Sequence, residues 1–291
     1  MSISMNSTCL ECFLSKRLAQ VRALGTDEQA TEMAKKLSML YATSNPDMDS
    51  AILGGMAEEM INTYYGIDPD RMQEEKELSN RFVMERLDKI RSRVEAAEDP
   101  IYAGLQYAVL GNYLDFSALY GQVSFEDMDK MLDTAASIDL DKECYAQFLT
   151  DLQKGKRLLY LTDNAGEICF DRILGEVIAE AYPQLEITFC VRGKPIVNDA
   201  TREDAEIAGI QFPVIDNGIA IGGTPVHMIG AEAKAALDQA DVILAKGMGN
   251  TESMFGCGYN IYYAFLVKCV RFMEFFDAPK MKPMFIRDRV Q

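Results

Sequence analysis

The sequence predicts an α/β protein: a doubly wound α/β/α domain with a parallel sheet in residues 151–291, preceded by an all-helical domain in residues 1–150. The length of 291 residues suggests about two domains. The first half repeats apolar residues at helical spacing and has no alternating strand pattern. From about residue 155, short apolar runs alternate with helical segments, which is typical of parallel strands joined by right-handed crossovers.

The helical half begins with apolar residues at spacings of three and four, from Leu10 to Val21 and from Ala30 to Leu40. The pattern continues in four further segments, whose opposite faces are rich in charged residues. These predicted helices are 51–65, 76–97, 103–109 and 125–135. Proline and glycine residues separate the segments, as expected at helix ends.

The second half contains the predicted strands, each a short apolar run between turn residues. They are 157–163, 186–192, 212–216 and 241–246, with a fifth at 283–287. The predicted helices between them are 167–182, 200–208 and 226–239. This order places helices on both faces of one sheet.

Composition excludes several classes of function. Lys and Arg total 29 and Asp and Glu total 45, so the formal charge of −16 repels nucleic acid and anionic membranes. No apolar run is long enough to span a membrane, and the N-terminus lacks the pattern of a signal peptide, so we expect a cytoplasmic protein. Seven cysteines without framework spacing indicate reduced thiols.

Two sequence features could hold a soft metal, and neither predicts such a site. Cys9 and Cys12 have the spacing of a metal or redox pair, but a zinc cage would need distant partners. His227 is the single histidine, which excludes zinc sites built on two or more histidines. A structural position at the start of the helix 226–239 is the favoured interpretation of His227.

Polar residues follow the predicted strands at the points where they end. Ligands of such sheets bind outside the carboxyl ends of the strands, so these residues are expected to converge at one edge. The candidates are Asp163, Asn164 and Glu167 after the first strand, Arg192, Asn198 and Asp199 after the second, and Lys246, Gly247, Asn250 and Glu252 after the fourth.

The residue types at this edge suggest phosphate chemistry assisted by a divalent cation. Asp163, Asn164 and Asp199 offer the hard oxygen donors that suit Mg²⁺ or Mn²⁺. Such an ion would offset charge on a phosphoryl oxygen and activate a water molecule.

Three further residues complete the predicted chemistry. Lys246, followed by a glycine-rich turn, is a candidate phosphate clamp, and Arg192 can make a bidentate phosphate contact. Glu167 can act as a general base or bind a ligand hydroxyl.

Each of these residues also has a structural interpretation. Asp163 could cap the helix that begins after it, with Glu167 stabilised by the helix dipole. Thr201 and Asp204 have the spacing of a capping box, so Asp199 could merely precede a cap. The joint placement at one edge favours a functional role over these alternatives.

The motifs of this edge resemble those of the metal-dependent damage-control phosphatase family, formerly a domain of unknown function. The segments that carry the resemblance are 163–167, 194–201 and 246–252. Further segments resemble the archaeal and bacterial subfamily of that family. These are Cys9-x-x-Cys12, Asp68-Pro69 with Lys76 and Asn80, and 111–116.

The resemblance implies a helical domain followed by an α/β/α domain, and a phosphatase that uses Mn²⁺, Ni²⁺, Co²⁺ or Mg²⁺. Its implied substrates are small phosphorylated metabolites, such as sugar phosphates or damaged phosphometabolites. The motif positions imply Asp163, Asn164 and Asp199 as metal ligands and Lys246 as a phosphate contact. They also imply that Asn112 and Asp115 contribute the edge of the helical domain. Met248 departs from the pattern, since a polar residue is common there.

Two other functions remain open from the residues alone. An S-adenosylmethionine-dependent methyltransferase could use the same sheet, with Gly166 near the cofactor and an acidic residue on its ribose. A non-catalytic protein that binds a phosphometabolite or a metal would need the same edge without turnover. The oligomeric state is not predicted.

Overall fold

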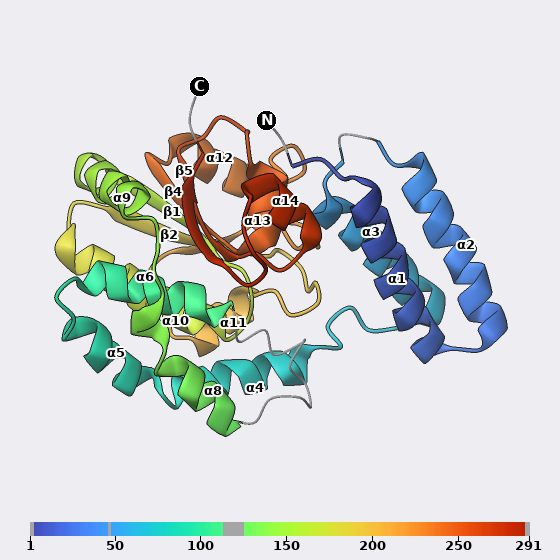
Figure 1. The fold of residues 1–291 in the computed structure, drawn as a ribbon, viewed down its shortest axis with the longest axis horizontal. Helices are drawn as coiled ribbons and strands as arrows, with labels where there is room; N and C mark the ends of the chain where they lie inside the picture. The colour runs from blue at the N-terminus through green and yellow to red at the C-terminus, as the bar shows by residue number, and fades with distance from the viewer. Residues whose placement is uncertain (1–2, 46–47, 113–124, 289–291) are drawn as a thin grey trace.

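The computed structural model describes residues 3–45, 48–112 and 125–288 (Figure 1). Its centre is a six-stranded sheet in the order β3-β2-β1-β4-β5-β6, in which the first five strands are parallel and β6 runs antiparallel to β5. The strands are β1 Arg157–Leu161, β2 Glu186–Val191, β3 Val214–Asp216, β4 Val242–Lys246, β5 Ile261–Leu266 and β6 Pro283–Arg287. The predicted α/β class with a doubly wound, mostly parallel sheet is confirmed.

Side chains of each central strand alternate between two apolar cores, one on each face of the sheet. On β1, Leu158 and Tyr160 enter one core, while Leu159 and Leu161 enter the other. Both sets are buried, which explains why these strands read as continuous apolar runs rather than as alternating patterns.

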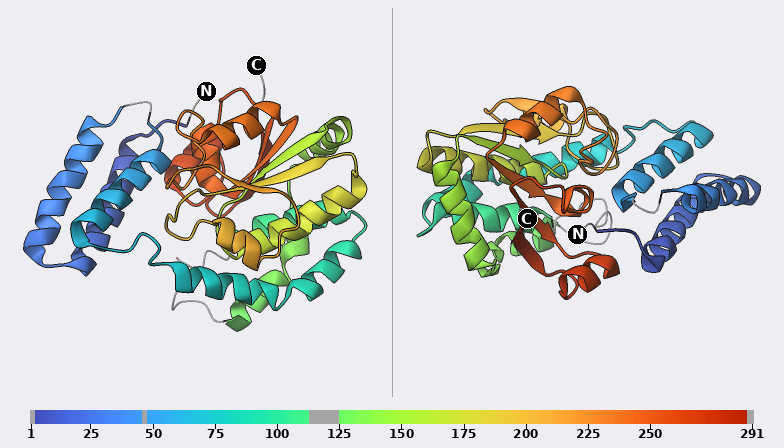
Figure 2. Two further views of the ribbon diagram at one scale, coloured as in Figure 1. Left: turned by 180° about the vertical axis from the view of Figure 1, so that it is seen from behind. Right: turned by 90° about the horizontal axis from the view of Figure 1, so that it is seen from above.

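Helices cover both faces of the sheet (Figure 2). Those packed in the larger core are α4 Gln73–Met84, α5 Leu87–Glu95, α6 Pro100–Gly111, α9 Lys142–Lys154, α10 Glu167–Ala181 and α11 Arg202–Ile207, with α8 Phe125–Leu132 and the 3-10 turn Ala135–Ser137 at its edge. Those on the other face are α12 Ala231–Gln239, α13 Gly247–Met254 and α14 Val270–Phe276. In the described part of the chain, no helix combines the length and the apolar character needed to cross a membrane.

The first three helices, α1 Ser7–Leu24, α2 Asp27–Thr43 and α3 Ser50–Tyr65, lie to one side of the sheet and share their own small core (Figures 1 and 2). Glu58 on α3 fastens this unit, because its buried carboxylate pairs with Arg17 of α1 and with Arg71 of the following segment, each at 2.5 Å. Burial would raise the pKa of Glu58, but the two guanidinium groups outweigh it and hold the pKa below its usual value.

The helices before residue 150 therefore belong to two packing environments. The helices α1–α3 form a unit of their own, whereas α4, α5, α6, α8 and α9 pack in the same core as the sheet. The close approach of α6 to α10 depends on Gly104, where an added Cβ would lie 3.2 Å from Leu174 Cδ1. A division of the chain at residue 150 into independently folding domains stays a prediction.

Several elements differ from the sequence prediction. The predicted helix 76–97 is two helices, α4 and α5, and the predicted helix 226–239 begins only at Ala231. The helices α9, α13 and α14 and the strand β5 were not predicted. The strand β5 is a buried apolar run, a pattern that by itself does not distinguish a strand from a buried helix.

Truncation of Leu174, at the contact between α10 and α6, should lower the stability of the protein. We expect Leu174→Ala to lower the free energy of unfolding by about 3 kcal/mol, because the side chain is fully buried against Gly104. The melting temperature should fall by roughly 6–12 °C in thermal denaturation. Leu24→Ala, at a half-exposed position of α1, is the matched control and should change stability by less than about 0.5 kcal/mol.

Candidate active site

The carboxyl ends of β1, β2 and β4 meet at one edge of the sheet, called the site edge below. Leu161 pairs with Cys190 on one side and with Ala245 on the other, so the residues that follow these three strands emerge together. The loops after β1 and β2 are also joined directly. The Ala200 N–H donates to Asp163 O at 2.8 Å, and the Ala165 N–H donates to Asn198 O at 2.9 Å.

This pairing forms an isolated antiparallel bridge between Asn164 and Asp199, so two of the predicted ligand positions are held face to face. The Asp163 carboxylate lies beside them and accepts a hydrogen bond from Asn164 Nδ2 at 3.0 Å. The structure thus brings Asp163, Asn164 and Asp199 to one place, as the sequence predicts.

Asn112, at the end of α6, links the helical half to this cluster. Its amide nitrogen donates to Asp163 Oδ2 at 3.0 Å and to Glu167 Oε1 at 2.8 Å. Asn164 Nδ2 donates to the same Glu167 oxygen at 2.6 Å. The Asn112 side-chain oxygen accepts from the backbone of Leu266 on β5 at 3.4 Å, which fixes the direction of the amide.

The electrostatics of the cluster favour a bound cation. Burial, followed by the nearby charges of Glu167 and Asp199, raises the pKa of Asp163 well above its usual value. Arg192 and Lys268 act in the opposite direction without cancelling the effect. A buried carboxylate beside two others is stabilised by any positive charge that enters among them.

Arg192 crosses the site edge beneath this cluster and is almost fully buried. Its Nε donates to Asp199 Oδ2 at 2.6 Å, and its Nη1 donates to Asn250 Oδ1 at 2.9 Å and to Thr224 Oγ1 at 3.2 Å. Its Nη2 is buried, has no hydrogen-bond partner among the described residues, and lies 3.8 Å from Asp163 Oδ1. An unused guanidinium donor at this position fits an anionic ligand.

Lys246 is completely buried, and its ammonium group faces carboxylates. Its Nζ lies 2.8 Å from Asp171 Oδ1 and 3.3 Å from Glu167 Oε2. Burial alone would lower the pKa of Lys246, but these two carboxylates outweigh it and raise the pKa to about 12. The lysine therefore stays charged at the site edge.

Asp171 is a residue that the sequence analysis missed. It lies four residues after Glu167 on α10, so both carboxylates share one helix face, a spacing that could have revealed it. Tyr160 also donates a hydrogen bond to Asp171 Oδ1 at 2.7 Å. Burial raises the pKa of Asp171 to about 6, against the opposing charge of Lys246.

The residues after Lys246 form the first turn of α13 rather than the predicted glycine-rich turn. Gly247 has a φ of +78°, and a Cβ there would overlap the Asp163 carboxylate, so only glycine fits. Asn250 Nδ2 donates to Thr162 O at 3.0 Å and to Lys246 O at 2.7 Å, which ties α13 to β1. The start of α13 thus lies against Asp163, and helix N-termini favour anions.

The remaining predicted residues lie in different places. Asn198 is in the loop beside Asp199, and its backbone oxygen accepts a hydrogen bond from the Ala165 N–H. The Glu252 carboxylate accepts a hydrogen bond from the Ser50 hydroxyl of α3, so it joins α13 to the helical unit instead of facing Asp163. Asp115 lies outside the described residues.

Of the structural interpretations offered for these residues, the structure contains the capping box but not the Asp163 cap. Asp163 does not cap α10, whose N-cap is Gly166 and carries no side-chain cap. The capping box is present, because Asp204 accepts from both the backbone and the hydroxyl of Thr201. His227 precedes α12 within a turn closed by the Met228 N–H and Pro225 O at 2.9 Å, not at the start of a helix.

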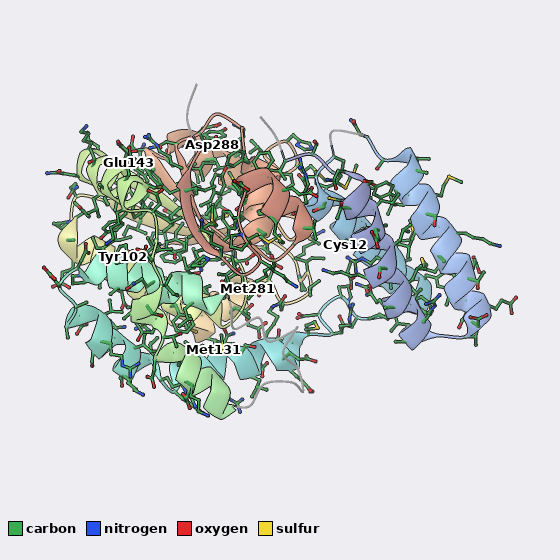
Figure 3. All side chains as sticks on the ribbon, in the orientation of Figure 1. Cys12, Tyr102, Met131, Glu143, Met281 and Asp288 are labelled. Atoms are coloured by element: carbon green, nitrogen blue, oxygen red, sulfur yellow. The ribbon has the colours of Figure 1, made fainter. Side chains whose placement is uncertain are left out.

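The donor set at the site edge consists of oxygen atoms. Within residues 3–45, 48–112 and 125–288, no three His, Cys, Asp or Glu side chains gather as a metal site would require. The predicted set, Asp163, Asn164 and Asp199, includes an amide, and its hard donors fit Mg²⁺ or Mn²⁺. All seven cysteines are free thiols. Cys12, labelled on α1 in Figure 3, is exposed, whereas burial raises the pKa of Cys9.

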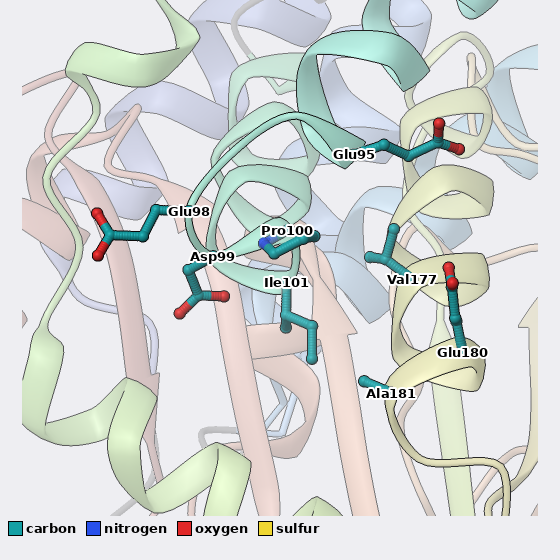
Figure 4. Close-up of a pocket in the computed structure, with 8 residues that line it drawn as sticks. All are labelled: Glu95, Glu98, Asp99, Pro100, Ile101, Val177, Glu180 and Ala181. Atoms are coloured by element: carbon teal, nitrogen blue, oxygen red, sulfur yellow. The ribbon is translucent and has the colours of Figure 1, made fainter.

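A cavity of about 840 Å³ lies between the start of α6 and the end of α10, away from the site edge (Figure 4). The side chains that line it include four carboxylates and no cationic group. These are Glu95, Glu98, Asp99 and Glu180. The cavity is larger than many ligand sites need, but its charge repels the anionic ligands that Arg192 and Lys246 attract.

Comparison with known proteins identifies a matching family and similar chains. Residues 5–282 match the family described as "Damage-control phosphatase ARMT1-like domain". A damage-control phosphatase of Pyrococcus horikoshii is 29% identical over 94% of both chains. An uncharacterized protein of Methanocaldococcus jannaschii is 35% identical over 92% of this chain and 90% of that one. The crystal structure of a DUF89 family protein from P. horikoshii superposes with a TM-score of 0.84 at 26% identity, covering 98% of this chain and 99% of that chain.

The burial of the Glu252 carboxylate should make stability depend on pH, and the hydrogen bond from Ser50 only partly opposes this effect. Burial raises the pKa of Glu252 from 4.5 to about 7, so the folded protein retains a proton that the unfolded chain releases. This stabilisation is complete below the unfolded pKa and is lost as the pH rises through about 7. Glu252→Gln keeps a hydrogen-bonding group without the charge. We expect its free energy of unfolding, relative to that of the wild type, to rise by on the order of 2 kcal/mol when the pH is raised from about 5 to about 8.

Urea denaturation at the two pH values measures this difference. Glu274→Gln removes one charge from an exposed position of α14 and should follow the wild-type pH dependence. Parallel pH curves for the wild type and Glu252→Gln would contradict the assignment.

Proposed function

The chain belongs to the family of damage-control phosphatases with an ARMT1-like domain, and we propose that it is a divalent-cation-dependent phosphatase that hydrolyses phosphate monoesters of small metabolites. The observation that carries the proposal is the pairing of opposite charges at the site edge. The Asp163 carboxylate, whose pKa is raised by burial and by the charges of Glu167 and Asp199, lies 3.8 Å from Arg192 Nη2, for which the described residues offer no hydrogen-bond partner. A divalent ion together with a phosphate group satisfies both requirements.

Asp163, Asn164 and Asp199 would hold the ion, for which Mn²⁺, Ni²⁺, Co²⁺ and Mg²⁺ are candidates. When bound, such an ion offsets charge on the phosphate and lowers the pKa of water. Entry of the positive charge relieves the repulsion that raises the pKa of Asp163, so binding and ionisation support each other.

The chain's own residues bind and orient the phosphate. Arg192 donates from Nη2, and the first turn of α13 offers backbone N–H groups beside Gly247. Lys246 adds a fixed positive charge, because Asp171 and Glu167 hold its ammonium group in place. Phosphoryl transfer depends mainly on such positioning and charge stabilisation.

Glu167 is the candidate general base. Its Oε1 accepts from the amides of Asn112 and Asn164, whereas its Oε2 faces Lys246 Nζ at 3.3 Å. We assign to Oε2 the proton released when a water molecule attacks phosphorus. As the P–O bond breaks, the ester oxygen takes up a proton, either the one held at Glu167 Oε2 or one from solvent water, and leaves as the alcohol. Asn112, and Asp115 by resemblance to the family, would contribute from the helical half to the selection of that alcohol.

The remaining predictions concern partners and location. A small phosphorylated metabolite is the proposed partner, and the charge of −16 argues against nucleic acid. A cytoplasmic location stays a prediction.

Metal removal tests the proposal directly. We expect hydrolysis of p-nitrophenyl phosphate to disappear with EDTA and to return when Mn²⁺ or Ni²⁺ is added in excess, because the carboxylate cluster needs the cation. Turnover that persists in EDTA would contradict the metal dependence. Ligand binding without any turnover in the metal-loaded protein would favour a non-catalytic binding protein instead.

The matched variants for that experiment are two aspartates, one in the loop after β1 and one at the end of β3. Asp163→Ala should reduce turnover by at least about 100-fold with the fold retained by circular dichroism. Asp216→Ala, at the end of β3, removes a carboxylate whose partner is the exposed Arg202 and should retain turnover. Wild-type rates in Asp163→Ala would refute the metal assignment.

Asp171 is expected to act as a positioning residue through Lys246. Asp171→Asn keeps the size of the side chain but removes the charge that holds the ammonium group, so kcat should fall about tenfold with little change in KM. Steady-state kinetics measures both constants, and Tyr160→Phe, which loses only the hydroxyl bond to Asp171, should have a smaller effect. Equal losses in the two variants, or an unchanged kcat in Asp171→Asn, would contradict this role.

A further inference from the structure

Asn80 on α4 is a completely buried polar residue to which the proposed function gives no role. Its Oδ1 accepts a hydrogen bond from the Gly166 N–H at 2.7 Å, and its Nδ2 donates to Asp204 Oδ1 at 2.8 Å. Gly166 is the N-cap of α10 and Asp204 lies in the first turn of α11, and α4 packs against both of these helices (Figure 1). One amide therefore connects the starts of two helices that follow different strands.

The bond to Gly166 fixes the end of the loop after β1. Gly166 lies between the proposed ligands Asp163 and Asn164 and the proposed base Glu167. Its φ is +78°, and α10 has no side-chain cap of its own. The backbone N–H groups at a helix start have no acceptor within the helix, and leaving one buried without a partner is unfavourable. Asn80 supplies that acceptor from another helix.

The bond to Asp204 reaches the loop after β2. Asp204 Oδ2 accepts from the backbone N–H of Thr201 at 2.8 Å and from its hydroxyl at 2.9 Å. Thr201 comes two residues after Asp199, the third proposed ligand. Lys76, also on α4, pairs with the same Asp204 oxygen at 2.8 Å, and both side chains are 1% exposed. The lysine offsets the Asp204 charge, so this attachment adds no net charge near the site edge.

The two ligand loops are thus attached to each other at two points. The bridge between Asn164 and Asp199 is one, and the path from Gly166 through Asn80 to Asp204 is the other. A second attachment keeps the loops from turning about the first. Functional side chains must be held to within about 0.5 Å of the productive geometry. Groups that orient metal ligands without touching the ion commonly change metal affinity by about 10–100-fold.

We propose that Asn80 is a positioning residue of the divalent-cation site and holds the two ligand loops at the separation that the ion requires. It acts through Gly166 and Asp204 rather than by contact with the ion. The inference rests on the proposed function, which supplies the ion, but the attachment of the loops is a property of the chain itself.

Binding of Mn²⁺ to the purified protein, measured by isothermal titration, tests the inference. Asn80→Leu is similar in size and removes both hydrogen bonds, so the Kd for Mn²⁺ should rise at least about tenfold. Val83→Ala is the matched control, because it truncates a fully buried apolar side chain of the same helix. It should lower the melting temperature and change the Kd by less than about twofold. Equal weakening in both variants, or a wild-type Kd in Asn80→Leu, would overturn the inference.

An exchange of the amide and the carboxylate keeps the test decisive if Asn80→Leu does not fold. Asn80→Asp alone sets two carboxylates against each other and should weaken Mn²⁺ binding, although its added negative charge would by itself attract the ion. Adding Asp204→Asn restores a donor and an acceptor and returns the net charge to that of the wild type. The Kd of this double variant should lie within about threefold of the wild-type value. A double variant that binds no better than Asn80→Asp alone would overturn the inference.

Hydrogen–deuterium exchange of the metal-free protein separates a failure of this inference from a failure of the proposed function. Peptides that contain residues 163–166 and 199–201 should exchange at least about tenfold faster in Asn80→Leu than in the wild type or in Val83→Ala. If the wild type binds no Mn²⁺, the proposed metal dependence is wrong, and exchange alone decides whether Asn80 holds the loops. Unchanged exchange in Asn80→Leu overturns the inference whatever the metal does.

Discussion

The burial of several carboxylate groups side by side costs free energy, and the rest of the site edge is arranged around this cost. Four of them, Asp163, Glu167, Asp171 and Asp199, lie at the site edge and are almost completely buried. Two buried cations, Lys246 and Arg192, contact members of this set. Burial, and then the charges of Glu167 and Asp199, raise the pKa of Asp163 well above its usual value, although Arg192 and Lys268 act in the opposite direction. The proposed divalent cation would carry charge of the sign that offsets this set of carboxylates.

The fold assembles this cluster from parts that are distant in the sequence. Parallel pairing brings the ends of β1, β2 and β4 together, and the bridge between Asn164 and Asp199 adds a direct link between two loops. Asn112 comes from α6, which packs in the same core as the sheet. The side-chain amide of Asn112 donates hydrogen bonds to both Asp163 and Glu167, so the first half of the chain contributes to the candidate site.

Residues that follow a predicted strand could be found from the sequence. Asp163, Asp199 and Lys246 were predicted because a strand end fixes where its next residues emerge. Asp171 could not be found in this way, since its position depends on how α10 turns over the sheet. Lys268 follows β5, whose apolar run gave no evidence of a strand, so the charge that it brings near Asp163 was also missed.

The residues at strand ends also differ from those of α3 in what fixes their positions. The charged side chains of the site edge come mostly from strand ends and are fixed by the sheet, whereas α3 packs in the separate core of α1–α3. That helix packs tightly on the loop after β3, since a Cβ on Gly55 would lie 2.9 Å from Ala220 O. Its orientation depends on Glu58, Arg17 and Arg71, far from the carboxylate cluster in the sequence. Changes within α1–α3 can therefore shift Gly55 against Ala220, while the backbone hydrogen bonds that join the loops after β1 and β2 keep Asp163 and Asp199 in place.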